Sequence, residues 1–381
     1  MRETMMRRWT LMLGTFALVS TGLGCDDGNP GIFMGDTVSL DTDDTVAGDT
    51  TETADTAETS ETADTTVADT ADTTVADTAD TTVADTTPQP PPIVSATCVD
   101  GQYTETLPTG TEDISGIISS FDPNDKIGFA DRILSARYPI GAFLTREAYK
   151  IPQGKAFLDQ IMGQATTASR LLGTLSTVVH EGGHVYDINQ GGFSDNVLVF
   201  RTDLRLSCQG GDTAERFGNT FARSRINGDT HSSKLPGDFY QDVYLDGDPN
   251  DATFDGGDQG FNSVLEEATQ YVNSLATDFA IDDTAGNSST SARDGILTFL
   301  WYIERYLQFA RTNFPDAHAF ILGDSCHREA ILTIWGRAWL YLDATDSIAS
   351  LGIDDDAIEA LVLEEGLLTE IQAVREAHGC R

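Results

Sequence analysis

The sequence predicts an α+β domain over residues 98–381, mostly helical with one small sheet. Apolar residues recur at the i, i+3, i+4 spacing of an amphipathic helix within residues 169–190, and helical patterns dominate after residue 260. Two short segments that follow the first helix, Asn196–Phe200 and Leu204–Cys208, are the best strand candidates. Collagen-like, coiled-coil and polytopic membrane classes are excluded, because the chain has no such period and no second long apolar run.

The amino terminus, residues 1–25, has the features of a secretory signal. Arg7 and Arg8 precede a short apolar run, and small residues lead up to Cys25. A cysteine in this position resembles the lipidation site of bacterial lipoproteins, in which Cys25 would become the lipidated first residue. Ordinary signal cleavage that leaves Cys25 as a thiol is the alternative. We therefore expect an exported protein of the cell envelope or cell surface that contacts the membrane only through a lipid anchor.

Residues 26–97 form an acidic segment with 17 Asp and Glu and no Lys or Arg. The unit Ala-Asp-Thr-Thr-Val-Ala-Asp-Thr occurs three times, at 63–70, 71–78 and 79–86. So few large apolar residues cannot offset the conformational entropy of folding, and like charges keep such a chain extended. We expect a disordered linker that holds the domain away from its anchor.

The charge of the whole chain limits its partners. The formal net charge is −38 at pH 7, and the part after residue 97 is itself strongly acidic. A negative surface repels phosphate backbones and anionic lipid headgroups. Nucleic acid is therefore excluded as a partner, and so is electrostatic docking to a membrane.

Four cysteines remain when Cys25 is set aside, and an even number in an exported domain predicts two disulfides. Three pairings are open. We expect Cys98–Cys208 and Cys326–Cys380, which would join each end of the domain to its body; free buried thiols are the alternative.

The chain after residue 290 is predicted to supply core helices. Ile296–Phe309 and Ile331–Tyr341 carry aromatic residues at spacings typical of packing. Asp354, Asp355 and Asp356 precede an apolar pair, as at a helix amino end, where the helix dipole favours negative charge.

The motif that indicates chemistry is His180-Glu181-Gly182-Gly183-His184, which matches the pattern HExxH. Histidines four residues apart on a helix share one face, so both imidazoles can bind one metal ion. Glu181 is then placed beside the metal rather than on it, as the general base for a water molecule. The two glycines cost helix stability, which indicates close approach of a packed helix or a substrate.

This motif resembles that of the zincin metallopeptidases, which implies a zincin-like domain with a small sheet on the motif helix, and a Zn²⁺ ion with a third protein ligand. The metzincin branch has glycine and histidine where this chain has Asp187 and Gln190. The gluzincin branch takes a glutamate from a later helix, and residues 264–271 are similar to that helix. The resemblance implies Glu266 as the third ligand.

Glu267 is a rival ligand, because it lies closer to the apolar face of its helix. The spacer between His184 and Glu266 is long for this branch, so an inserted subdomain is expected. Asp187 and Gln270 are candidates to orient a ligand imidazole. The candidates to stabilise an oxyanion are His231, Tyr240, Tyr244 and Tyr271.

The acidic turn between Asp246 and Asp258 is a weaker candidate, for a Ca²⁺ site, because its spacing departs from that of an EF-hand. The sequence thus predicts an exported zinc metallopeptidase that hydrolyses peptide or protein substrates. A surface binding or scaffold lipoprotein, with a structural metal or none, is the alternative.

Overall fold

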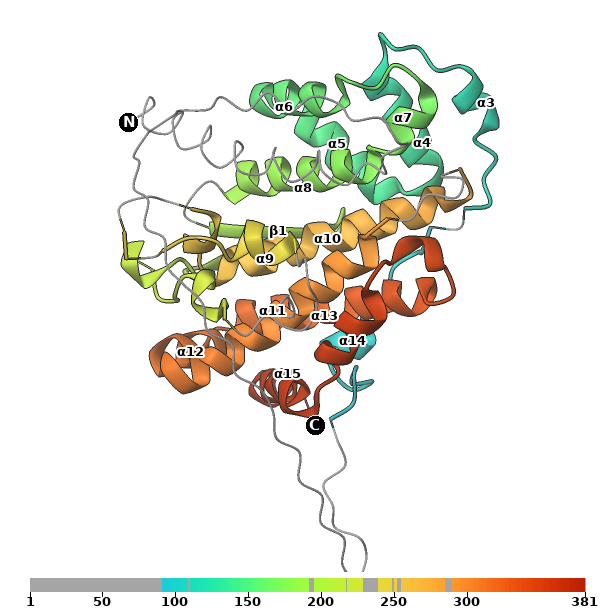
Figure 1. The fold of residues 1–381 in the computed structure, drawn as a ribbon. Coiled ribbons are helices and arrows are strands. Elements are labelled where there is room, and N and C mark those ends of the chain that lie inside the picture. The colour runs from blue at the N-terminus through green and yellow to red at the C-terminus, as the bar shows by residue number, and fades with distance from the viewer. Residues whose placement is uncertain are drawn as a thin grey trace, which may run out of the picture. The chain divides into compact units, whose positions relative to one another are not determined.

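Two helices at the centre of the protein, α8 (Leu175–Gly191) and α10 (Phe261–Ile281), pack against each other and organise the fold (Figure 1). The structure is a computed structural model. It describes residues 91–108, 110–191, 195–216, 218–228, 239–248, 250–251, 255–284 and 290–380, all within one compact unit. The expected signal, the lipidation site Cys25 and the repeats of the linker lie outside the described residues.

Helix α8 forms because Leu175, Val178, Val179 and Val185 bury one stripe of side chains. The prediction of one helix through residues 169–190 is wrong at its start. A short helix, α7 (Ala168–Leu172), ends at Gly173, and α8 begins after it. Glycine has low helix propensity, which explains why the helix is interrupted at Gly173.

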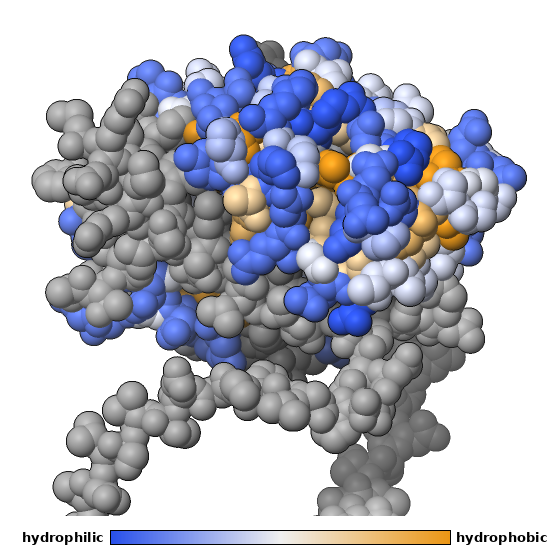
Figure 2. Space-filling view, turned by 90° about the horizontal axis from the view of Figure 1, so that it is seen from above, coloured by the Kyte–Doolittle hydropathy of each residue, from blue (hydrophilic) through white to orange (hydrophobic). Residues whose placement is uncertain are grey.

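Helices α5 and α6 cover one side of α8, and α4 packs against α5. Proline at the first position starts both α5 and α6, where its missing N–H costs nothing. The coloured part of the face seen from above in Figure 2 is largely hydrophilic, with small apolar areas between the polar ones. These helices therefore direct their apolar sides inward. Their bounds are α4 (Lys126–Arg137), α5 (Pro139–Tyr149) and α6 (Pro152–Met162).

On the other side, α10 packs against two long helices, which carry many of the large aromatic residues of the core. The predicted core helices at 296–309 and 331–341 lie within them, and the acidic run at 354–356 starts a helix as expected. The helices of this side are α11 (Ala292–Asn313), α12 (Pro315–Gly323), α13 (Ser325–Thr345), α14 (Asp355–Val362) and α15 (Glu365–His378).

The sheet has two antiparallel strands, β1 (Asp195–Arg201) and β2 (Leu204–Gln209), with Asp195 opposite Gln209. Strand β1 lies against α8 and α10. Its two faces are both buried, because Leu198 joins the main core and Val199 packs in a second apolar cluster with Leu144. The expected α+β class, mostly helical with a small sheet on the motif helix, is confirmed to this extent.

The spacer between the two central helices holds this sheet and a run of short turns and loops, and its described residues belong to the same compact unit as α8. The expected inserted subdomain is therefore not found in the described part. The short elements of the described chain are α2 (Val99–Gln102), α3 (Ser115–Ser119), α9 (Phe239–Tyr244), η1 (Ala214–Arg216), η2 (Arg223–Ile226), η4 (Gly256–Asp258), η5 (Asp282–Thr284) and η6 (Ala349–Leu351).

Two disulfides are present, as predicted, but the expected pairing is wrong. The bonds are Cys98–Cys380 and Cys208–Cys326. The packing explains this, because α13 contacts both α2 and β2. Cys208 of β2 thus meets Cys326 in the first turn of α13, while Cys98, just before α2, meets the carboxyl-terminal Cys380.

The packed chain extends to residues before Cys98. The carbonyl of Pro92 accepts a hydrogen bond from Arg375 at 2.8 Å, and that of Ile93 accepts one from Trp335 at 2.7 Å. The ends of the folded part therefore lie together, beside α15. Among the described residues, none of the helices combines the length and the apolar character needed to cross a bilayer.

Candidate metal centre

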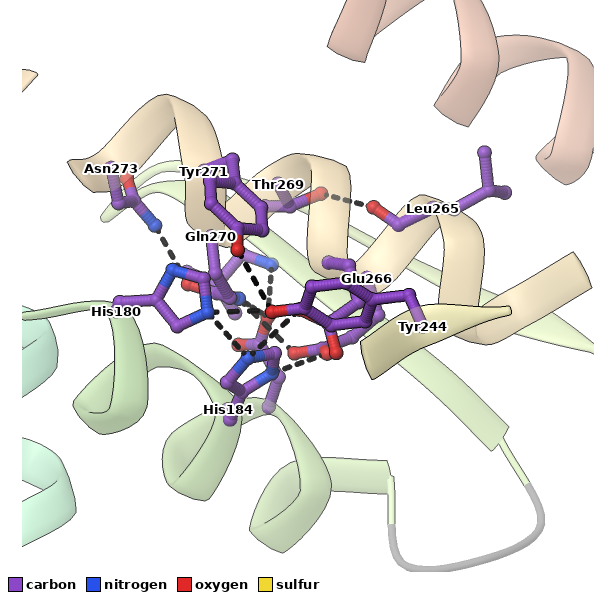
Figure 3. A network of polar contacts seen from close by, with 12 residues as sticks. His180, His184, Tyr244, Leu265, Glu266, Thr269, Gln270, Tyr271 and Asn273 are labelled. Carbon is purple, nitrogen blue, oxygen red and sulfur yellow. Dashed lines mark hydrogen bonds and ion pairs between the residues drawn. The ribbon is translucent and has the colours of Figure 1, made fainter. Parts of the chain in front are cut away.

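His180 and His184 project from the same face of α8, one turn apart, as the motif predicts. Their Nε2 atoms lie 2.9 Å from each other, and both side chains are buried. Figure 3 shows the two imidazoles directed toward the side chains of α10.

Each imidazole is held by a polar group on its Nδ1 atom. Nδ1 of His180 lies 3.0 Å from the hydroxyl of Ser274, and Nδ1 of His184 contacts the carboxylate of Glu266. These contacts leave both Nε2 atoms for a shared ligand. Groups on the far nitrogen of a metal-binding histidine fix the ring orientation and its tautomer.

Glu267 completes the group. One of its oxygens, Oε2, lies 3.6 Å from Nε2 of His180 and 3.4 Å from Nε2 of His184. The three ligand atoms are all within 4.8 Å of one another, and this is the one group of three metal-binding side chains found among the described residues. Both Glu267 oxygens are buried without a hydrogen-bond partner there. Two imidazole nitrogens and such a carboxylate fit a divalent ion such as zinc.

The geometry therefore favours the rival ligand, Glu267, over Glu266. Glu266 contacts the opposite nitrogen of His184, so it orients the imidazole instead. Adjacent residues on a helix point about 100° apart, and only Glu267 points toward the Nε2 atoms. The apolar face of α10, which Glu267 borders, therefore indicated the geometry of the site better than the family resemblance, which implied Glu266.

The charges of these side chains are strongly coupled. Burial would raise the pKa of Glu267, but the imidazoles of His184 and His180 lower it below its usual range. Burial alone would lower the pKa of His184, but the carboxylates of Glu266 and Glu267 raise it well above its usual range. The site therefore holds an ionised carboxylate, and a proton on His184 competes with a cation for the same position.

Glu181 is buried, with only 3% of its surface exposed, and its Oε2 atom has no hydrogen-bond partner among the described residues. Burial raises its pKa. A carboxyl group with a raised pKa, next to His180, is suited to act as a general base or acid.

Behind the histidines, Gln270 joins α8, α10 and the sheet. Its amide nitrogen donates to Asp187 at 3.1 Å and to Glu266 at 3.2 Å. Asp187 also accepts a 3.3 Å bond from the backbone of Val199 in β1. Burial raises the pKa of Asp187 well above its usual range. We expected Gln270 or Asp187 to contact a ligand imidazole directly. Instead, Glu266 contacts the imidazole of His184, and Gln270 links Glu266 to Asp187.

The two glycines of the motif have a packing reason. A Cβ atom at Gly183 would lie 1.8 Å from Oε1 of Gln270, and one at Gly182 would lie 3.3 Å from the backbone of Thr145. The expected close approach is therefore by packed helices, α10 on one side and α5 on the other.

Two of the predicted tyrosines belong to the site. The ring of Tyr271 packs edge-on against that of His180, with centroids 4.8 Å apart, and its hydroxyl lies 2.8 Å from the hydroxyl of Tyr244 (Figure 3). The hydroxyl of Tyr240 instead donates to the carbonyl of Ser291 at 3.2 Å. His231 lies outside the described residues.

Sequence reasoning missed Ser274 and Arg223. Ser274 had a usable signal, because Glu266, Gln270 and Ser274 follow one another at intervals of four and so share a stripe of α10. Arg223 had none. Its guanidinium lies over the ring of Tyr244, 5.2 Å from the ring centroid. Burial lowers its pKa, while the charge of Glu267 raises it.

The predicted Ca²⁺ site is not found in the described part of the acidic turn. Carboxylates there bind backbone groups instead. Asp246 accepts from the N–H of Gly247, and Asp258 accepts from the N–H of Asp255. The turn is stabilised by its own hydrogen bonds.

Comparison with known proteins adds no family. The chain matches no protein-family model, and neither the curated proteins nor the solved structures gave a match.

Proposed function

We propose that this protein is a zinc-dependent peptide hydrolase of the zincin type, with His180, His184 and Glu267 as the metal ligands. One observation carries the proposal. Two imidazole nitrogens and a carboxylate without a hydrogen-bond partner converge within 4.8 Å, and the buried Glu181 follows the first ligand. Three protein ligands leave a coordination position for water or substrate, which is typical of catalytic rather than structural zinc.

When bound at this position, zinc would act as a Lewis acid that makes water nucleophilic near neutral pH. Glu181 would accept a proton from the attacking water and pass it to the leaving amine. The paired hydroxyls of Tyr244 and Tyr271 are the candidates to donate a hydrogen bond to a developing oxyanion.

The finer features of the proposal are supported by the packing around α8 and by the amino-terminal sequence. The packing of β1 against α8 and the contact of α8 with α10 support a zincin-like fold of gluzincin type. The amino-terminal pattern supports export to the cell envelope, with Cys25 as a lipid anchor and an acidic linker between Cys25 and the domain.

The test is a comparison of the full chain with its Glu181→Gln variant. Both should bind about one zinc per chain, measured by elemental analysis of the purified protein. Cleavage of a mixed peptide library should fall by about 100-fold or more in the variant, because a general base is removed.

Equal cleavage by the two proteins would remove Glu181 from the mechanism. One zinc per chain without any cleavage by either protein would favour the alternative, a surface binding or scaffold lipoprotein with a structural metal.

A further inference from the structure

Arg223 differs from the other buried arginines of the described chain. Five arginines are buried there, and four of them bind a carboxylate. Arg223, with 1% of its surface exposed, makes no hydrogen bond and no ion pair within 4.0 Å through its side chain to any described residue, and its Nε and Nη1 atoms are buried. The other four pairs are Arg137–Asp283, Arg293–Asp355, Arg337–Glu105 and Arg375–Asp100.

A buried guanidinium without a partner is costly, because it loses its hydration and gains no hydrogen bonds in return. This chain supplies a carboxylate to the buried arginine in every other case above. The exception therefore needs a reason, and an anion that arrives from outside would provide it.

The place of Arg223 indicates which anion. Its guanidinium covers the ring of Tyr244, whose hydroxyl reaches Tyr271 above His180. Its charge also acts on Glu267, the proposed metal ligand. The backbone of Arg223 is fixed by a 2.8 Å bond to Gln259, so the side chain starts from a rigid point. The unpaired guanidinium of Arg223 thus lies beside the proposed metal centre.

We propose that Arg223 binds a carboxylate of the peptide substrate beside the metal centre. The planar fork of a guanidinium matches a carboxylate with two parallel hydrogen bonds. The strongly acidic chain repels anions at long range, so a carboxylate needs a local cation of this kind. The carboxylate comes either from the carboxyl terminus of the peptide or from an internal Asp or Glu. This inference rests on the proposed function for its substrate, but its test does not require cleavage.

The test measures peptide binding to the full, zinc-loaded chain that carries Glu181→Gln, so that turnover does not interfere. The probes are mixed hexapeptides with a fluorophore on the amino end. They are prepared as carboxyl-terminal acids or amides, and with internal Asp and Glu or with Asn and Gln. Anisotropy should show that one of the two carboxylate forms binds at least about tenfold more tightly than its neutral counterpart, as expected for charge-assisted hydrogen bonds.

Arg223→Gln should reduce that preference to nearly one. The matched control is Arg225→Gln on the same turn, because Arg225 contacts Glu215 and Asn250 and not the tyrosines. The control should keep the preference. If Arg223→Gln does not fold, Arg223→Lys decides the matter. It keeps the charge but loses the fork, and should lower the preference severalfold.

The arms separate the two hypotheses. Equal binding of all four probe types, or a preference that survives Arg223→Gln, would overturn the role of Arg223, whether or not the unmodified protein cleaves peptides. A carboxylate preference that depends on Arg223 supports the proposed role of Arg223 even if the unmodified protein cleaves nothing. In that case the hydrolase function alone is overturned.

Discussion

Gly183 of α8 and Gln270 of α10 occupy adjoining space, such that a Cβ atom at residue 183 would lie 1.8 Å from the side-chain oxygen of Gln270. The motif helix and the helix that carries Glu267 are therefore matched to each other at this point. Oε1 of Gln270 also accepts a 2.8 Å bond from Asn273, so the amide has little freedom to move away.

Gly183→Ala should destabilise the protein by about 1 to 3 kcal/mol, because it overpacks this contact. It should also weaken zinc binding, since Gln270 holds Glu266. The control is Gly366→Ala, where nothing lies within 4 Å of the added Cβ. That change should leave zinc binding intact and raise stability by roughly 0.4 to 1 kcal/mol. Denaturant unfolding and zinc titration of the two variants check this; a Gly183→Ala protein as stable as the original would contradict it.

Substitution of the two neighbouring glutamates should separate ligand from orienting residue. Glu266→Gln should weaken zinc binding by about 10- to 100-fold, as expected when the group that orients a ligand is changed. Glu267→Gln should weaken it further, because the amide replaces a carboxylate that binds the ion. Competition with a fluorescent chelator measures both. The reverse order would return Glu266 to the role of ligand.

The parts of this site that could be predicted from the sequence are those whose residues lie close together in the chain. The imidazoles and Glu181 come from one helical turn, so the local pattern placed them correctly. The choice between residues 266 and 267 depends on the rotation of α10 against α8. The apolar stripe of α10 carries that information, and similarity to another family does not.

Contacts between distant segments left no such pattern. The two strands and the core helices named from the sequence were found because their apolar spacing is local, whereas the break at Gly173 was missed. The pairing of cysteines and the position of Arg223 beside Tyr244 are set by how α13, β2 and the loops before α10 pack. Contacts of this kind cannot be predicted from local spacing in a single sequence, because they depend on how the whole chain folds.

The stability of the fold should depend on pH through Asp278 of α10. Burial raises the pKa of this carboxyl group to about 6, and the hydroxyls of Ser176 and Thr290 offset the effect only in part. The unfolded chain releases the proton near pH 4, while the folded chain retains it up to about pH 6. Stability is therefore greatest below pH 4 with respect to this group, and falls as the pH rises from about 4 to 6.

Asp278→Asn removes this effect and should stabilise the protein at pH 7 by about 1 to 3 kcal/mol. The same change at the exposed Asp316 should alter stability little. Thermal unfolding at pH 4.5 and pH 7 measures the difference. A variant that gains as much at pH 4.5 as at pH 7 would argue against the burial of a charge as the cause.

The disulfide pairing can be checked directly. A digest without reduction should release peptides that join Cys208 to Cys326 and Cys98 to Cys380. Replacement of Cys208 and Cys326 by Ser should cost about 2 to 5 kcal/mol, because the bond closes a long loop of the unfolded chain. Crosslinked peptides of any other pairing would disprove the assignment.

The bond between Cys98 and Cys380 has a mechanical consequence. It joins two cysteines that are 282 residues apart in sequence, beside the two ends of the folded chain. A stretching force applied between those ends would pass through the sulfur atoms and leave the helices between them unloaded. Pulled in an optical trap, the oxidised protein should lengthen hardly at all, and the same molecule should unravel only after a reductant is added.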